Sequence, residues 1–276
     1  MKLSLSTRIA ESSSRKDRAD MAIEALAPAA KAAGFAGLSM RASQLSVEAP
    51  AERVAEVARL IDAEGLAVSM VMGNVALAAN TPDAPDVLRH IGPHLDLAER
   101  LGCGLVRVML QNSDDIAAAQ RAADEAAERG ISLAQQTHWG SVCETVDEAL
   151  DVVARVGRRN FGITFEPANL LACGERDVKA AVQRLAPYIV NFYYQNVRLD
   201  PAGSHRFPTR ARGVVLIRYV PLDAPSEIPA GPLIEYLRQS GYDGWVTVHQ
   251  PLLDGQAVPD AIAEAARVFG PLVLPS

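Results

Sequence analysis

Cysteine, basic charge and long apolar runs are all scarce in this chain. Its cysteines, Cys103, Cys143 and Cys173, are odd in number, widely spaced and form no CxxC pair. This pattern argues against a disulfide framework and a thiolate zinc site, and it fits a reducing cytoplasm. The formal net charge of −6 argues against a nucleic-acid partner, because neutralising phosphates requires clustered Lys and Arg.

Membrane segments are also missing from the sequence pattern. The first residues, MKLSLSTRIAESSSRKDR, turn polar after a handful of positions and lack the apolar centre of a signal peptide. No later run approaches the length needed to span a bilayer. We therefore expect a soluble, cytoplasmic protein with no membrane partner.

Strand-like runs alternate with segments of helical periodicity along the whole chain. A chain of 276 residues with 49% apolar content can fill one barrel domain, which typically needs about 250 residues. The predicted strands are Lys2–Ser6, Gly37–Arg41, Ala67–Met72, Gly104–Leu110, Ile131–Gln136, Phe161–Glu166, Ile189–Gln195 and Trp245–His249. Eight β-then-α units predict a single (β/α)8 TIM barrel over residues 1–276. A doubly wound open sheet is the alternative, but the first turn, LSTRIAES, lacks a glycine-rich phosphate loop.

One irregular stretch, residues 198–230, is rich in Pro, Gly and Arg. Loops of this length are usually lids or disordered segments. Its arginines could clamp a phosphate or carboxylate, or they could face solvent in a homo-oligomer. We take Arg210 and Arg212 from this loop as candidate substrate-binding residues, together with Arg41, Arg107 and Asn169.

Polar residues end four successive apolar runs in the second half of the chain: Gln136, Glu166, Gln195 and His249. Barrel chemistry takes place where the carboxyl ends of the strands meet. A carboxylate there is costly to bury unless it is paired or metal-bound, so Glu166 is the strongest single candidate. The alternative for Glu166 is a helix-start carboxylate satisfied by backbone donors.

The seventh run, IVNFYYQN, leaves open whether Tyr193 or Gln195 faces the cavity, whereas Tyr194 fits core packing. His138 follows Gln136 by two positions and can share its face. His90 and His94 lie on a predicted helix and are expected at the surface.

The segments GFAGLSMR, GLAVSMVM, GISLAQQTHWGSVCETVDEAL, NFGITFEPANLL, NFYYQNVRL and SGYDGWVTVHQP resemble the xylose isomerase-like TIM-barrel family of sugar isomerases and epimerases. The resemblance implies a divalent metal and two glutamates that act as paired acid and base. By position, Gln136 replaces the first glutamate, Glu166 an aspartate and His249 the last glutamate, while Tyr193 falls on a histidine and Gln195 on a lysine.

These replacements change the chemistry that the resemblance implies. Glutamine cannot take up a proton, so His249 or His138 is left as the base, with Tyr193 as an assisting acid. One base and a metal that polarises a carbonyl suffice for proton transfer on one face. We therefore expect a metal-assisted isomerase acting on a small sugar-like carbonyl compound. A lyase or hydratase, or a sugar-binding barrel without turnover, is the alternative.

The predicted metal site consists of Gln136, Glu166, Gln195 and His249. Oxygen and imidazole ligands with a single formal charge favour Mn, Co, Ni or Zn over Mg.

Overall fold

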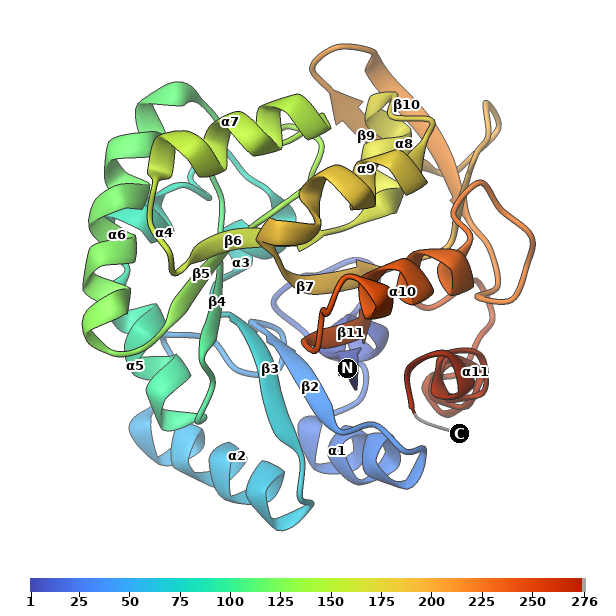
Figure 1. Cartoon of the computed structure of the whole chain (residues 1–276). Helices are drawn as coiled ribbons and strands as arrows, with labels where there is room; N and C mark the ends of the chain where they lie inside the picture. The colour runs from blue at the N-terminus through green and yellow to red at the C-terminus, as the bar shows by residue number, and fades with distance from the viewer. Residues whose placement is uncertain (275–276) are drawn as a thin grey trace.

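Eight parallel strands close into a barrel in the computed structural model, which describes residues 1–274 (Figure 1). The strands follow the cyclic order β1, β11, β7, β6, β5, β4, β3, β2. Their bounds are β1 Lys2–Ser6, β2 Gly37–Arg41, β3 Ala67–Met72, β4 Leu105–Val108, β5 Ser132–Gln136, β6 Phe161–Phe165, β7 Ile189–Tyr194 and β11 Trp245–Val248. The predicted (β/α)8 TIM barrel is confirmed, and each strand overlaps its predicted run.

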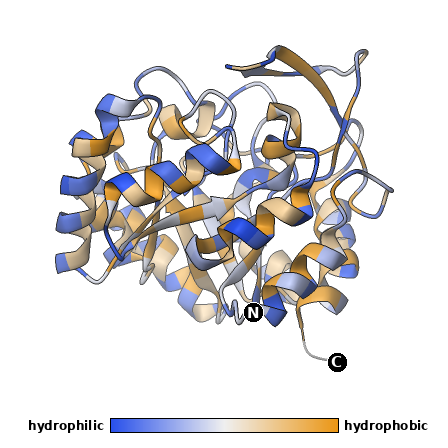
Figure 2. Ribbon diagram, turned by 45° about the horizontal axis from the view of Figure 1, so that its top comes forward, coloured by the Kyte–Doolittle hydropathy of each residue, from blue (hydrophilic) through white to orange (hydrophobic). Residues whose placement is uncertain are grey.

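Helices surround the barrel and turn their apolar sides toward it (Figure 2). On α2, for example, Val54, Val57 and Ile61 recur at helical spacing and are buried. The helices are α1 Ile23–Ala32, α2 Ala51–Ala63, α3 Val75–Ala79, α4 Asp86–Arg89, α5 Gly92–Arg100, α6 Ile116–Glu128, α7 Val146–Val156, α8 Pro167–Cys173, α9 Val178–Leu185, α10 Ala230–Gln239 and α11 Val258–Val273. Short 3-10 turns occupy η1 Thr7–Ala10, η2 Ser113–Asp115 and η3 Ala186–Tyr188.

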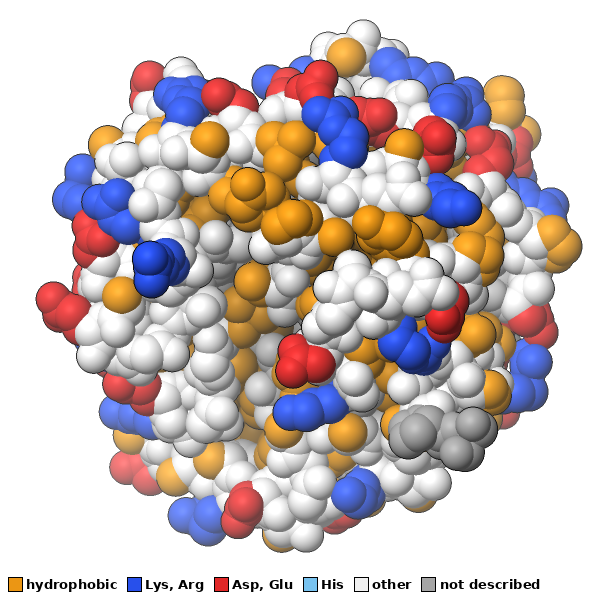
Figure 3. Space-filling view, in the orientation of Figure 1, with side chains coloured by type: hydrophobic (Ala, Val, Ile, Leu, Met, Phe, Trp, Pro, Cys, Tyr) orange, Lys and Arg blue, Asp and Glu red, His pale blue; other side chains and the backbone are white. Residues whose placement is uncertain are grey.

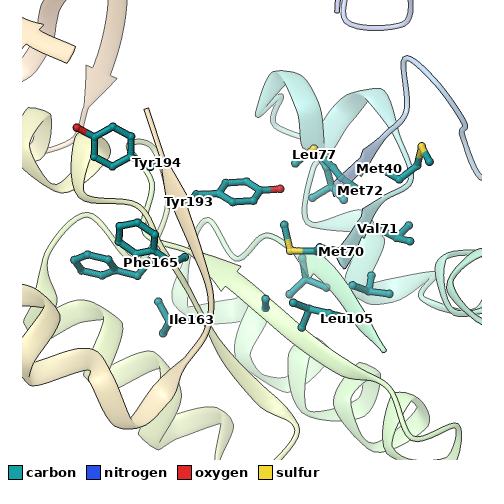
Figure 4. Close-up of a cluster of buried hydrophobic side chains, with 14 of the residues drawn as sticks. Met40, Met70, Val71, Met72, Leu77, Leu105, Ile163, Phe165, Tyr193 and Tyr194 are labelled. Atoms are coloured by element: carbon teal, nitrogen blue, oxygen red, sulfur yellow. The ribbon is translucent and has the colours of Figure 1, made fainter. Parts of the chain in front are cut away.

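Alternation along β7 sends neighbouring aromatic side chains in opposite directions (Figure 4). Tyr193 points across the barrel interior toward Met72, whereas Tyr194 lies with Phe165 on the outer side of the sheet. There Tyr194 packs against Phe269 of α11 and donates a hydrogen bond of 2.8 Å to the Ile228 carbonyl. The prediction that Tyr194 is a core residue is confirmed.

The stretch 198–230 is more regular than the sequence suggests. Its first half forms most of a three-stranded antiparallel sheet in the order β8, β10, β9, which stands out beside the barrel (Figures 1 and 2). The strands are β8 Val197–Leu199, β9 His205–Thr209 and β10 Gly213–Tyr219. β10 reads GVVLIRY, and its run of Val, Leu, Ile and Tyr favours a strand although the surrounding stretch is rich in Pro, Gly and Arg.

Charges of both signs are interspersed around the face of the molecule in Figure 3. Within the described residues, no helix is long and apolar enough to cross a membrane. One surface prediction is wrong: His94 on α5 is 3% exposed, because that side of the helix packs on the barrel. Burial lowers the pKa of His94 to about 4.

Candidate functional site

A cavity of about 230 Å³ lies where the carboxyl ends of the barrel strands meet. The structure brings together Gln136 from β5, Glu166 after β6, Gln195 after β7 and His249 after β11, all of which line this cavity. Also lining it are Arg8, Lys16, Arg41, Ala78, Ala79, Asn80, Arg107, His138, Trp139, Asn169, Phe207 and Tyr219. The last two come from the antiparallel sheet, which therefore forms one wall.

Glu166 is fully buried at the end of β6, where Pro167 stops the strand and begins α8. Glu166 is the N-cap residue of α8, but its side chain accepts no hydrogen bond from the backbone of that helix. The alternative in which backbone donors at a helix start satisfy the carboxylate is therefore not observed. Its Oε2 accepts hydrogen bonds from Nε2 of Gln136 and, at 2.9 Å, from Nδ2 of Asn169. Its Oε1 has no partner among residues 1–274.

Burial raises the pKa of Glu166 to about 7, although Arg8 and the bond from Gln136 pull it the other way. A carboxyl group with one free oxygen and a pKa near neutrality can both take and release a proton.

His249 stacks on Tyr193, with ring centroids 4.1 Å apart and an interplanar angle of 18°. Its Nδ1 lies 2.9 Å from the Ser6 hydroxyl. Burial and the nearby Arg8 lower the pKa of His249 well below its ordinary value, so the ring is neutral at physiological pH. The neutral imidazole ring of His249 can therefore take part in hydrogen bonds through its ring nitrogens, but it is a weak base.

Tyr193 is absent from the cavity lining, whereas Gln195, which directly follows β7, lines the cavity. The Tyr193 hydroxyl lies 2.5 Å from that of Ser39. Burial raises the pKa of Tyr193 to about 12 and keeps the phenol protonated.

Both ring nitrogens of His138 form hydrogen bonds. Its Nδ1 lies 2.7 Å from the carbonyl of Trp139, which can only accept, so Nδ1 carries the proton. Nε2 then accepts from Nδ2 of Asn80 at 3.3 Å. Burial and Arg107 lower the pKa of His138 to about 3, which makes it a poor general base near neutral pH.

Arg8 is the main residue that sequence reasoning missed. It follows β1 in η1, and its Nη1 donates to Oε1 of Gln195 at 2.7 Å and to the carbonyl of His249 at 3.3 Å. Its Nη2 donates to the Tyr219 hydroxyl at 3.0 Å. The sequence did contain an indication of Arg8, because this residue follows the first predicted strand just as Gln195 and His249 stand at the ends of later strands. Nothing in the sequence pointed to Asn80.

Arg41 and Arg107 reach the cavity from β2 and β4. Arg41 forms a buried, two-pronged ion pair with Glu11, at 2.7 and 3.0 Å. Arg107 has only neutral partners: the Leu77 carbonyl at 2.7 Å, Oδ1 of Asn80 at 3.1 Å and the Met72 sulfur at 3.4 Å. Among residues 1–274, its Nε has no partner.

The loop arginines lie elsewhere, because the antiparallel sheet turns them toward α7 and α8. Arg210 forms an ion pair with Glu148, and its backbone N–H donates to Glu144 at 2.9 Å. Arg212 donates to the Ala172 carbonyl at 2.9 Å. The structure does not bring either side chain into the cavity with Glu166.

The residues present do not fit the predicted metal ion. The amide oxygen of Gln195 already accepts from the Arg8 guanidinium, and Gln136 turns its NH₂ group toward Glu166. Within residues 1–274, no group of three or more His, Cys, Asp or Glu side chains could hold a metal. A guanidinium within the ligand set also repels a divalent cation. The ligand set therefore does not support a resident divalent metal.

Residues 27–271 match the model of the xylose isomerase-like TIM barrel family. The chain belongs to this family. It is similar over 140 residues, at 31% identity, to the rhizopine catabolism protein MocC of Rhizobium meliloti. That match covers 50% of this chain and 42% of the relative, so the chain spans less than half of the curated protein that it matches.

Solved structures with the same fold include enzymes of different kinds. D-psicose 3-epimerase from Clostridium cellulolyticum H10, in complex with D-tagatose, has a TM-score of 0.72 at 14% identity, and all of both chains is covered. A probable 3-DHS dehydratase, AsbF of Bacillus anthracis, has a TM-score of 0.69 at 15% identity, with 98% of this chain and 99% of that one covered. A xylose isomerase-like protein of Mycobacterium smegmatis, in complex with magnesium, has a TM-score of 0.70 at 14% identity, with 99% and 95% covered. At these identities the likeness shows the fold.

Proposed function

We propose that this protein is an enzyme that moves a proton on one face of a small polyhydroxylated carbonyl compound, in an aldose–ketose isomerisation. The observation that carries the proposal is the Glu166 carboxyl group. It is buried, its Oε1 has no hydrogen-bond partner in the part of the chain that the structure describes, and it lines a cavity at the carboxyl ends of the strands. The fold and the family, which includes sugar-processing enzymes, support a substrate of this class.

In the proposed reaction, the Glu166 carboxylate removes the proton from the carbon beside the substrate carbonyl. The electron pair moves into an enediolate, whose oxygen is stabilised by a guanidinium of the cavity. The protonated carboxyl group then returns the proton to the former carbonyl carbon on the same face, while a proton moves between the two substrate oxygens. Glu166 thus replaces His249 and His138 as the proposed base, because burial keeps both rings neutral with low pKa values.

A lyase or hydratase is the second candidate. It would use the same proton removal, followed by loss of a hydroxyl group from the next carbon, and the protonated Glu166 would assist the departing water. The probable dehydratase of the same fold supports keeping this candidate.

Proton exchange in deuterated water tests the proposal directly. Three- to six-carbon aldoses and ketoses, incubated with the protein, should incorporate deuterium at one carbon beside the carbonyl, and NMR follows the exchange. Glu166→Gln should slow it by about 10²- to 10⁴-fold, the usual contribution of a general base. Glu128→Gln, which changes an exposed glutamate on α6, is the matched control. Equal exchange in Glu166→Gln and wild type contradicts the proposal, and binding without any exchange favours the sugar-binding barrel.

A further inference from the structure

The cavity is strongly cationic for a site of its size. Four of the residues that line it are cations, Arg8, Lys16, Arg41 and Arg107, whereas Glu166 is the single lining carboxylate among residues 1–274. Such a cavity concentrates anions and disfavours cations.

Two of these cations are already paired. Glu11, which is buried and does not line the cavity, accepts from Arg41 through both carboxylate oxygens and from Lys16 at 3.0 Å. The two ion pairs hold the Glu11 carboxylate in place: burial alone would raise its pKa, but Arg41 and Lys16 outweigh burial and lower it. Arg41 and Lys16 are thus both paired with a carboxylate, although one negative charge serves the two of them.

The other two cations have no such partner. Within residues 1–274, Arg8 donates to an amide, a carbonyl and a phenol, and Arg107 to a carbonyl, an amide and a thioether. Neither guanidinium is hydrogen-bonded to a carboxylate of the described chain. A buried charge is costly unless an opposite charge pairs with it, and Arg107 is 2% exposed with an unpartnered Nε.

We propose that the cavity recognises a substrate that carries an anionic oxygen group, a carboxylate or a phosphate, and that Arg8 and Arg107 bind this group. This proposal adds an anionic group to the substrate of the proposed function. It rests on the proposed function only for the carbonyl part of the substrate. A guanidinium offers five N–H donors in a planar fork, which suits the paired oxygens of either anion.

The volume limits the rest of the substrate. A cavity of about 230 Å³ holds roughly eight water molecules, at about 30 Å³ each. An anionic group with three or four hydroxylated carbons fits this space.

Binding without turnover tests the inference independently of catalysis. Calorimetric titrations compare erythronate, a four-carbon carboxylate, with erythritol, its neutral counterpart, and with glycerol 3-phosphate. At least one of the two anions should bind about tenfold or more tightly than erythritol, the fold-change that corresponds to one charge-assisted hydrogen bond. Which anion binds more tightly assigns the group as carboxylate or phosphate. Equal binding of erythronate, glycerol 3-phosphate and erythritol overturns the inference.

Substitutions of Arg8 test whether this residue binds the anionic group. Arg8→Gln should lose the preference for the anion, Arg8→Lys should keep part of it, and Arg158→Gln, at an exposed ion pair with Asp124, should keep all of it. Melting temperatures of all variants establish that they are folded. A folded Arg8→Gln variant with wild-type anion preference overturns the role of Arg8. Anion binding without proton exchange would support the anion site and contradict the proposed isomerase activity.

Discussion

Nη1 of Arg8 donates a hydrogen bond of 2.7 Å to Oε1 of Gln195, a residue 187 positions further along the chain. The contact joins the carboxyl ends of β1 and β7 and places a fixed positive charge among the residues that were expected to hold a metal ion. A guanidinium at this position repels a divalent cation and attracts an anionic group of a substrate.

The first prediction concerns metal. The sequence predicts a bound Mn, Co, Ni or Zn ion, but the ligand set does not fit one, so we expect Mn²⁺ or Co²⁺ to leave the melting temperature unchanged. Elemental analysis of the purified protein should find no stoichiometric metal. A bound metal that is lost in both Glu166→Gln and His249→Asn would restore the metal-assisted mechanism.

The second prediction is the acid limb of the pH–rate profile. Proton removal by Glu166 requires the ionised carboxylate, so kcat/KM should fall below a pH of about 7, the value to which burial raises the pKa of this group. The limb should persist in His249→Asn, because the pKa of His249 lies well below its ordinary value. Loss or displacement of the limb in this variant would assign it to the imidazole instead.

The third prediction is the effect of Glu166→Gln on stability. The pKa of Glu166 is about 7 in the folded protein and 4.5 as its ordinary value. Its ionisation is therefore disfavoured by folding, and the free energy of unfolding should fall as the pH rises from 4.5 to about 7. Glutamine cannot ionise, so the variant should gain up to about 3 kcal/mol over wild type at pH 8 and little at pH 4.5.

Urea denaturation at both pH values measures this difference, with Glu128→Gln as the control. An equal effect of Glu166→Gln at pH 4.5 and pH 8 would show that Glu166 is not held with a raised pKa.

The fourth prediction is that the protein does not invert a carbinol carbon. Inversion requires proton removal on one face and delivery on the other, and Gln136 can do neither. NMR of ketoses in deuterated water should therefore detect single-site exchange, or loss of water, without C3 inversion. Efficient inversion would require a second acid–base group opposite Glu166.

The fifth prediction concerns Tyr193, which sequence reasoning proposes as an assisting acid. Its ring lies under His249 and its hydroxyl bonds to Ser39, away from the cavity lining. Tyr193→Phe should lower the free energy of unfolding by about 0.5–1.5 kcal/mol, the usual value of one hydrogen bond. It should leave kcat nearly unchanged, and a hundredfold loss of kcat at unchanged stability would return Tyr193 to the catalytic group.

The periodicity of apolar residues predicted the barrel strands, because the side of a strand or helix that is buried can be recognised from the spacing of apolar residues along that segment. The stretch 198–230 was harder to read. β10 and its partner β9 are both largely exposed, and β9 contains Pro208, so neither strand shows the pattern of a buried strand.

The order of residues was sufficient to predict the eight strands, the family and the convergence of four polar residues, because parallel strands in a barrel must bring their carboxyl ends together. These residues are Gln136, Glu166, Gln195 and His249. How their side chains behave depends on contacts that exist only in the folded barrel. It places Arg8 against Gln195, pairs Arg41 with Glu11 and leaves Arg107 with neutral partners. Charges and pKa values depend on burial and on neighbours that are distant in the chain, and no local pattern of residues encodes those neighbours.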